Sequence, residues 1–167
     1  MIFRPTIAMN SVLDITPELL KKMQVKALVL DLDNTLTTHN NPKPADGVLE
    51  WIDTMTSHNI RLIIVSNNKA ERVTPFADML GLEFVPRGAK PLPKGFKQAI
   101  DRLGMPKENV CAVGDQIFTD ILGANFAGIR SIFVFPIELE GSRFFKLKRA
   151  IEKPLLPEIK KEDRNER

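Results

Sequence analysis

The sequence has little cysteine, no long apolar run and only a small excess of positive charge. Its single cysteine, Cys111, excludes an intrachain disulfide and suits the cytosol. No apolar run approaches the roughly 18 residues of a membrane-spanning helix, and the segment MIFRPTIAMNSV lacks the continuous apolar stretch of a signal peptide. A net charge of +3 is weak evidence for nucleic-acid binding. We therefore expect a cytoplasmic protein without a nucleic-acid partner.

What the chain does contain is enough apolar sequence for one folded core. With 167 residues, of which 43% are hydrophobic, it is the size of a single domain. We place that domain at residues 1–153 and expect the charged tail, residues 154–167, to be disordered. Near the N-terminus, Thr16 as N-cap and Pro17 as first helical residue predict a short helical extension that ends near Met23.

Short apolar runs alternate with amphipathic segments along the domain. The runs are continuous in apolarity, which is typical of strands whose two faces are both covered. They predict five strands: Ala27–Leu30, Leu62–Val65, Glu83–Val85, Val110–Val113 and Ser131–Phe135. The segments between them carry apolar residues at helical spacing, and Gly81 and Gly104 are candidate C-caps. This alternation predicts a three-layer, doubly wound α/β fold with a mostly parallel five-stranded sheet.

Polar motifs follow three of the predicted strands. The first strand runs into DLDNT, the second into SNN and the fourth into GDQIFTD. In open α/β sheets the ligand lies beyond the carboxyl ends of the strands, so we expect these motifs to meet at one edge. The sequence therefore predicts one site built from three separate segments.

The acid pair in DLDNT predicts a divalent metal. Asp31 and Asp33 are two residues apart, so on an extended chain their side chains face the same side. Two carboxylates this close repel each other, and a cation removes the conflict. Mg²⁺ prefers oxygen ligands, and Asp115 from the fourth strand is positioned to add a further carboxylate.

With phosphate charge masked by the metal, one acid can attack phosphorus while the other protonates the leaving oxygen. Ser66 offers a hydroxyl to the phosphoryl group, and Asn67 and Asn68 offer amide donors. A lysine would counter the charge on the phosphoryl oxygens. Lys90 is the preferred candidate, and Lys94, four residues later, is the alternative.

Taken together and in order, DLDNT, SNN, KP before a helix, and GDQIFTD resemble the four motifs of the haloacid dehalogenase (HAD) superfamily phosphatases, subfamily IIIA. Within that subfamily the chain is most similar to the YqeG-type proteins, which are related to mitochondrial phosphatidylglycerophosphate phosphatases. The resemblance implies a Rossmann-like HAD fold. It also implies an enzyme that hydrolyses phosphomonoesters through an aspartyl-phosphate.

The resemblance further implies a role for each matching residue. Asp31 would be the nucleophile and Asp33 the general acid/base, while Ser66 and Lys90 would hold the phosphoryl group. The Mg²⁺ ligands would be the Asp31 carboxylate, the Asp33 carbonyl and Asp115, with Asp120 as a supporting acid.

Several alternatives stay open from the sequence. Asp120 could be a helix-surface acid, and Asn68 could only shape its turn. We expect His39 to be solvated and Cys111 to be a small core residue. The whole fold could also serve as an interaction scaffold with little turnover. A P-loop is excluded because GAKPLPKG lacks the required spacing.

The gaps after the first and third strands are too short for a cap domain. The resemblance associates capless members with large substrates or with partners that complete the site. Basic and apolar residues alternate in the segment Ser142–Lys153, which suits a membrane surface carrying a lipid phosphate. A final helix packed on the sheet is the alternative reading. The expected partner is a phosphorylated substrate, with phosphatidylglycerophosphate as a candidate and peripheral membrane binding as its consequence.

Overall fold

The computed structural model describes residues 2–138 together with residues 150 and 154. The strands are β1 (Ile7–Met9), β2 (Ala27–Leu30), β3 (Arg61–Val65), β4 (Glu83–Val85), β5 (Val110–Gly114) and β6 (Arg130–Val134). The α-helices are α1 (Pro17–Lys22), α2 (Val48–Ser57), α3 (Ala70–Leu80), α4 (Lys94–Leu103) and α5 (Leu122–Ala127). Short helical turns cover Val12–Asp14, Lys107–Asn109 and Ile117–Ile121.

The strands form one parallel sheet in the order β1-β6-β5-β2-β3-β4, which confirms the doubly wound prediction. The predicted number of strands is wrong, because the sheet has six strands and not five. The additional strand is β1, which pairs with β6 through Ile7 and Ile132. It has only three residues and only its central one, Ala8, is buried, so it lacks the continuous apolar run of a central strand.

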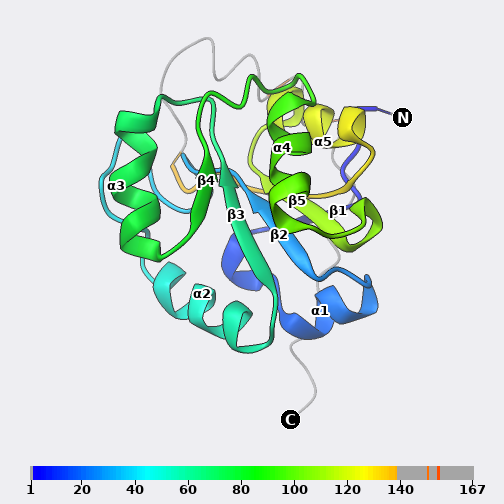
Figure 1. Ribbon diagram of the computed structural model, residues 1–167, viewed down its shortest axis with the longest axis horizontal. Coiled ribbons are helices and arrows are strands. Elements are labelled where there is room, and N and C mark those ends of the chain that lie inside the picture. Colours follow the sequence, from blue (N-terminus) through cyan, green and yellow to red (C-terminus); the bar gives the residue numbers. More distant parts are fainter. Residues whose placement is uncertain (1, 139–149, 151–153, 155–167) are drawn as a thin grey trace.

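Helices lie on both sides of the sheet (Figure 1). An apolar layer lies between the helices and the sheet on each face. On one face, Leu28 and Leu30 of β2 belong to a core cluster with residues of α1, α2 and α3. On the other face, Ala27 and Val29 belong to a cluster with α4 and α5. Because successive side chains of a strand point to opposite faces, a strand covered on both sides is apolar throughout. This explains why the apolar runs predicted the central strands.

The helix ends follow the expected capping residues. Thr16 accepts a hydrogen bond from the Leu19 backbone amide at the start of α1, and Pro17 is the first helical residue. Gly81 and Gly104 end α3 and α4 in the left-handed conformation, as predicted. The helical segment between β5 and β6 begins as a π-helical turn, Ile117–Ile121, and continues as α5.

No folded cap interrupts the described part of the chain. Residues 31–47, before α2, and residues 86–93, before α4, contain neither a helix nor a strand of the sheet. None of the helices within the described ranges has the length and hydropathy of a membrane span. The basic segment Ser142–Lys153 and the charged tail lie outside the described residues, apart from Ala150 and Pro154.

Candidate active site

The predicted motifs meet at the carboxyl ends of three adjacent strands, β5, β2 and β3. The Asp31 amide donates to the Val113 carbonyl, so the chain leaves β2 still paired with β5. A cavity of about 160 Å³ opens there. Its lining residues are Asp31, Asp33, Asn34, His39, Ser66, Asn67, Asn68, Lys90, Gln116 and Thr119. The structure therefore gathers both acids of DLDNT, all of SNN and Lys90 around one space.

Lys90 is the central cation of this cavity. Its Nζ lies 2.5 Å from Oδ1 of Asp31 and 2.6 Å from Oδ1 of Asp120. The lysine is 8% exposed, whereas Lys94 is exposed at the start of α4 and does not line the cavity. This geometry favours Lys90 over Lys94 as the lysine that faces the phosphoryl group.

Asn67 holds the backbone of Lys90. Its Oδ1 accepts from the Lys90 amide at 2.7 Å, and its Nδ2 donates to the Lys90 carbonyl at 3.1 Å. Glycine is needed nearby, because a Cβ on Gly88 would lie 2.7 Å from Cγ1 of Val65. The loop before α4 therefore packs closely against the end of β3, and the two hydrogen bonds of Asn67 hold it there. Direct contact between Asn67 and phosphate stays a prediction.

Burial and neighbouring charges shift the pKa values of Asp31 and Lys90, which form an ion pair. Burial and the nearby Asp120 raise the pKa of Asp31 to about 6, although Lys90 opposes the shift. Burial alone would lower the pKa of Lys90, but the charges of Asp120 and Asp31 outweigh it and raise that pKa. Lys90 is therefore an ammonium in the folded protein.

Three carboxylates at this site can hold a metal ion. Oxygen atoms of Asp31, Asp115 and Asp120 lie within 4.8 Å of one another, and Asp115 and Asp120 are buried. Asp120 packs directly on the end of β5, since a Cβ on Gly114 would lie 2.3 Å from its Cγ. Three buried or half-buried carboxylates with one lysine leave excess negative charge, and their hard oxygen atoms suit a divalent cation. Asp120 is thus part of the site and not a helix-surface acid.

The Asp33 side chain is not part of this acidic triad and is bonded instead to SNN and to α3. Its Oδ2 accepts from Asn68 Nδ2 at 2.5 Å, and its Oδ1 accepts from Arg72 Nη2 at 3.0 Å. Arg72 also donates to the Asn41 carbonyl at 2.9 Å. Asn68 therefore does more than shape its turn. The contribution of Asp33 to a metal would come from its backbone carbonyl, which stays a prediction.

Sequence reasoning gave no role to Arg72 or to the lining residues Asn34, Gln116 and Thr119. Arg72 lies one turn beyond SNN in α3, where a cation is usually a solvated helix residue. Gln116 and Thr119 line the cavity from within GDQIFTD, the motif that supplied the two acids. Their place in that motif was the available signal. His39 is exposed as expected, yet it also lines the cavity.

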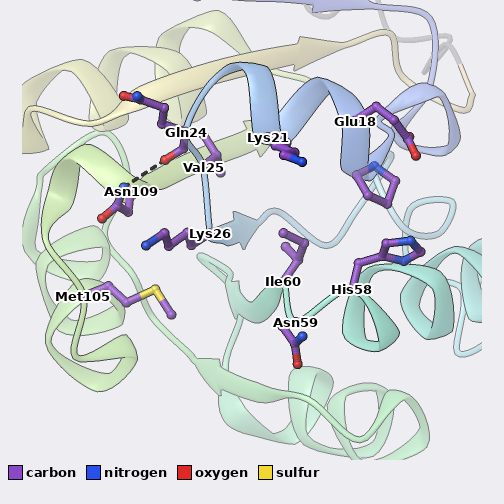
Figure 2. Close-up of a pocket in the computed structure, with 11 residues that line it drawn as sticks. Glu18, Lys21, Gln24, Val25, Lys26, His58, Asn59, Ile60, Met105 and Asn109 are labelled. Carbon is purple, nitrogen blue, oxygen red and sulfur yellow. Dashed lines mark hydrogen bonds between the residues drawn. The ribbon is translucent and has the colours of Figure 1, made fainter.

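A larger cavity, of about 860 Å³, lies at the opposite end of the sheet. Figure 2 shows Lys21, Lys26 and His58 around it, together with the hydrogen bond from Asn109 to the Gln24 carbonyl. Its lining contains one carboxylate, Glu18, and none of the motif residues. The smaller cavity is the better candidate active site, because it holds the clustered acids and the buried lysine.

Comparison with known proteins gives the family. The sequence matches the family model of haloacid dehalogenase-like hydrolases over residues 39–128 and that of mitochondrial PGP phosphatases over residues 1–75. It is 35% identical over 159 residues to the probable phosphatase YqeG of Bacillus subtilis, covering 95% of this chain and 92% of that protein. The chain belongs to the haloacid dehalogenase-like hydrolases. Within this family it is of the YqeG type, and the prediction of a phosphatase is confirmed at the level of the family.

Solved structures of low sequence identity show the same fold. A 4-nitrophenylphosphatase from Thermotoga maritima aligns with a TM-score of 0.59 at 15% identity, covering 72% of this chain and 92% of that one. An uncharacterized protein from Listeria monocytogenes aligns with a TM-score of 0.58 at 20% identity, covering 71% and 84%. These likenesses confirm the HAD-like architecture. The scaffold alternative is not favoured by the family.

Proposed function

We propose that this chain is a Mg²⁺-dependent phosphomonoester hydrolase that works through an aspartyl-phosphate on Asp31. The observation that carries the proposal is the position of Asp31. It lines the cavity with Asp33 and Ser66, lies 2.5 Å from the Lys90 ammonium, and shares the acidic triad. This closeness supports the proposal, because the groups proposed as nucleophile, proton donor, phosphate ligands and metal ligands all belong to one site.

In the first half-reaction, an Asp31 oxygen forms a bond to phosphorus while the bond from phosphorus to the ester oxygen breaks. Asp33 gives its proton to the departing oxygen, so the alcohol leaves neutral. In the second half-reaction, water attacks phosphorus and returns its proton to Asp33. The bond from Asp31 to phosphorus breaks, and inorganic phosphate leaves.

The surrounding residues bind and orient the phosphoryl group. Lys90 balances the charge on the phosphoryl oxygens, and the buried Ser66 hydroxyl donates to one of them. Asp31, Asp115 and Asp120 would hold or support Mg²⁺, together with the Asp33 carbonyl. When bound, the ion neutralises the phosphate charge that otherwise repels the attacking carboxylate.

Phosphatidylglycerophosphate is the proposed substrate, with peripheral membrane binding as its consequence. The match to the mitochondrial PGP phosphatase family model over residues 1–75 supports it, because that range includes the whole of DLDNT and SNN. Short loops in place of a cap leave the cavity accessible to a bulky substrate. The basic segment Ser142–Lys153 is the proposed contact with anionic lipid.

A phosphate-release screen with Mg²⁺ tests this proposal. It should include phosphatidylglycerophosphate, sugar phosphates, nucleotides and 4-nitrophenyl phosphate, with Asp31→Asn as the inactive control. Release by the native chain that Asp31→Asn and a chelator both abolish is the expected result. Absence of release from every phosphomonoester would contradict the proposed function.

A further inference from the structure

A second hollow adjoins the catalytic cavity. It has a volume of about 640 Å³ and is lined by Asn40, Asn67, Asn68, Lys69, Glu71 and Arg72. We call it the polar hollow. Asn67 and Asn68 line both spaces, so the two are neighbours at the start of α3. None of its residues binds phosphate or metal in the mechanism above, although the sequence predicted Asn67 and Asn68 as amide donors to the phosphoryl group.

Asp33 lies at the junction of the two spaces. It lines the catalytic cavity, and its carboxylate accepts hydrogen bonds from the side chains of Asn68 and Arg72. The backbone amide of Asn40 donates to the same carboxylate at 3.3 Å. All three donors line the polar hollow. Asp33, the proton donor of the proposed mechanism, is therefore oriented by residues of the polar hollow.

This placement fixes the direction in which the alcohol leaves. In phosphoryl transfer the attacking and leaving oxygens lie roughly in line on opposite sides of phosphorus. The inference rests on the proposed function, in which Asp31 attacks and Asp33 protonates the leaving oxygen. The leaving alcohol must then lie next to Asp33. We propose that the polar hollow is the leaving-group subsite and that it selects phosphomonoesters of hydroxylated alcohols.

The chemistry of the lining supports a hydroxylated group. The amide of Asn67 is bonded to Lys90, and the side-chain donors of Asn68 and Arg72 reach Asp33. Lys69 and Glu71 are exposed, and neither forms an ion pair with any residue in the described ranges.

The ammonium of Lys69 is a donor only and the carboxylate of Glu71 an acceptor only, while a hydroxyl both donates and accepts. An apolar alcohol would displace water from these groups without replacing the lost hydrogen bonds. The hollow should therefore discriminate between alcohols by their hydroxyl groups and not by their size.

A matched substrate pair tests the subsite in solution. Glycerol 3-phosphate and propyl phosphate have the same carbon chain, and only the first carries hydroxyls. We expect kcat/KM to favour glycerol 3-phosphate by about tenfold, and this ratio to fall at least about threefold in Lys69→Met and in Glu71→Leu. Lys22→Gln, an exposed lysine on α1 that lines none of these spaces, is the control and should keep the native ratio.

A second substrate pair tests whether the hydroxylated alcohol belongs to a lipid or to a soluble phosphomonoester. Short-chain phosphatidylglycerophosphate and phosphatidic acid, presented in the same detergent micelles, are both phosphomonoesters. Only the first carries a free hydroxyl on the carbon next to the phosphate ester. A variant-sensitive preference in either pair supports the subsite, and the pair that is turned over identifies the source.

Two results would count against the proposal in different ways. If 4-nitrophenyl phosphate is hydrolysed with Mg²⁺ but neither pair shows a preference, or if the preference survives both variants, the subsite is wrong and the phosphatase function stands. If no phosphomonoester is hydrolysed, the proposed function fails, and the subsite fails with it.

Discussion

The ammonium of Lys90 lies 2.5 Å from a carboxylate oxygen of Asp31, although 59 positions separate the two residues in the chain. The contact joins the end of β2 to the loop before α4. It also places the proposed nucleophile, Asp31, next to the ammonium group that would bind the phosphoryl oxygens.

Removing the Lys90 charge should affect both stability and turnover. In Lys90→Met the carboxylates of Asp31 and Asp120 lose their buried counter-charge, which should lower the free energy of unfolding by about 3 kcal/mol. Phosphate release should fall by at least about a hundredfold. Thermal unfolding and a release assay measure the two effects. Lys94→Met is the control, and equal losses in both variants would contradict the assignment to Lys90.

Arg72 should matter most for alcohols that need a proton in order to leave. Arg72→Met removes a hydrogen bond that orients Asp33, so we expect about a tenfold loss of kcat with an alkyl phosphate. The loss should be smaller with 4-nitrophenyl phosphate, since nitrophenolate leaves readily without protonation. Arg72→Lys should recover part of the activity. A uniform loss on both substrates would indicate a structural role for Arg72.

Metal binding should stabilise the folded chain independently of turnover. Mg²⁺ at about 100 times its dissociation constant should add about 2.7 kcal/mol to the free energy of unfolding. Asp115→Ala removes one ligand of the acidic triad and should require much more Mg²⁺ for the same stabilisation. Thermal unfolding over a Mg²⁺ titration measures both. Equal stabilisation of native and variant chains would place the metal elsewhere.

Cys111 reports on the core. It is the second residue of β5 and is buried, and this burial raises the pKa of its thiol to about 12. Since the thiolate is the reactive form, a disulfide reagent at pH 8 should label the native chain slowly and the urea-unfolded chain within seconds. Rapid, complete labelling without denaturant would contradict the burial of β5.

Much of the site could be predicted because parallel strands place their carboxyl ends at one edge of the sheet. Asp31, Ser66 and Asp115 each follow a continuous apolar strand, and the structure places all three strands side by side. The same argument predicted that GDQIFTD, with Asp115 and Asp120, lies at this edge. The fold class followed from the same alternation of strands and helices.

The sequence could not predict features that depend on contacts between distant segments. Strand β1 is short and half-covered, so it gives no apolar run. Arg72 could have faced solvent from α3 but turns toward Asp33. The amide of Asn67 fits a phosphate or a backbone equally well, and here it bonds to the backbone of Lys90. These choices come from packing between segments distant in the chain.

The most direct test of the mechanism is to detect the aspartyl-phosphate itself. The chain should be mixed with Mg²⁺ and a turned-over phosphomonoester, quenched with acid within one turnover, and treated with borohydride. Borohydride reduces a phosphorylated aspartate to homoserine, which mass spectrometry of the peptides can locate. We predict homoserine at position 31, absent when substrate is omitted. Turnover with Asp31 unmodified, or homoserine at another aspartate, would contradict the assignment of Asp31 as the nucleophile.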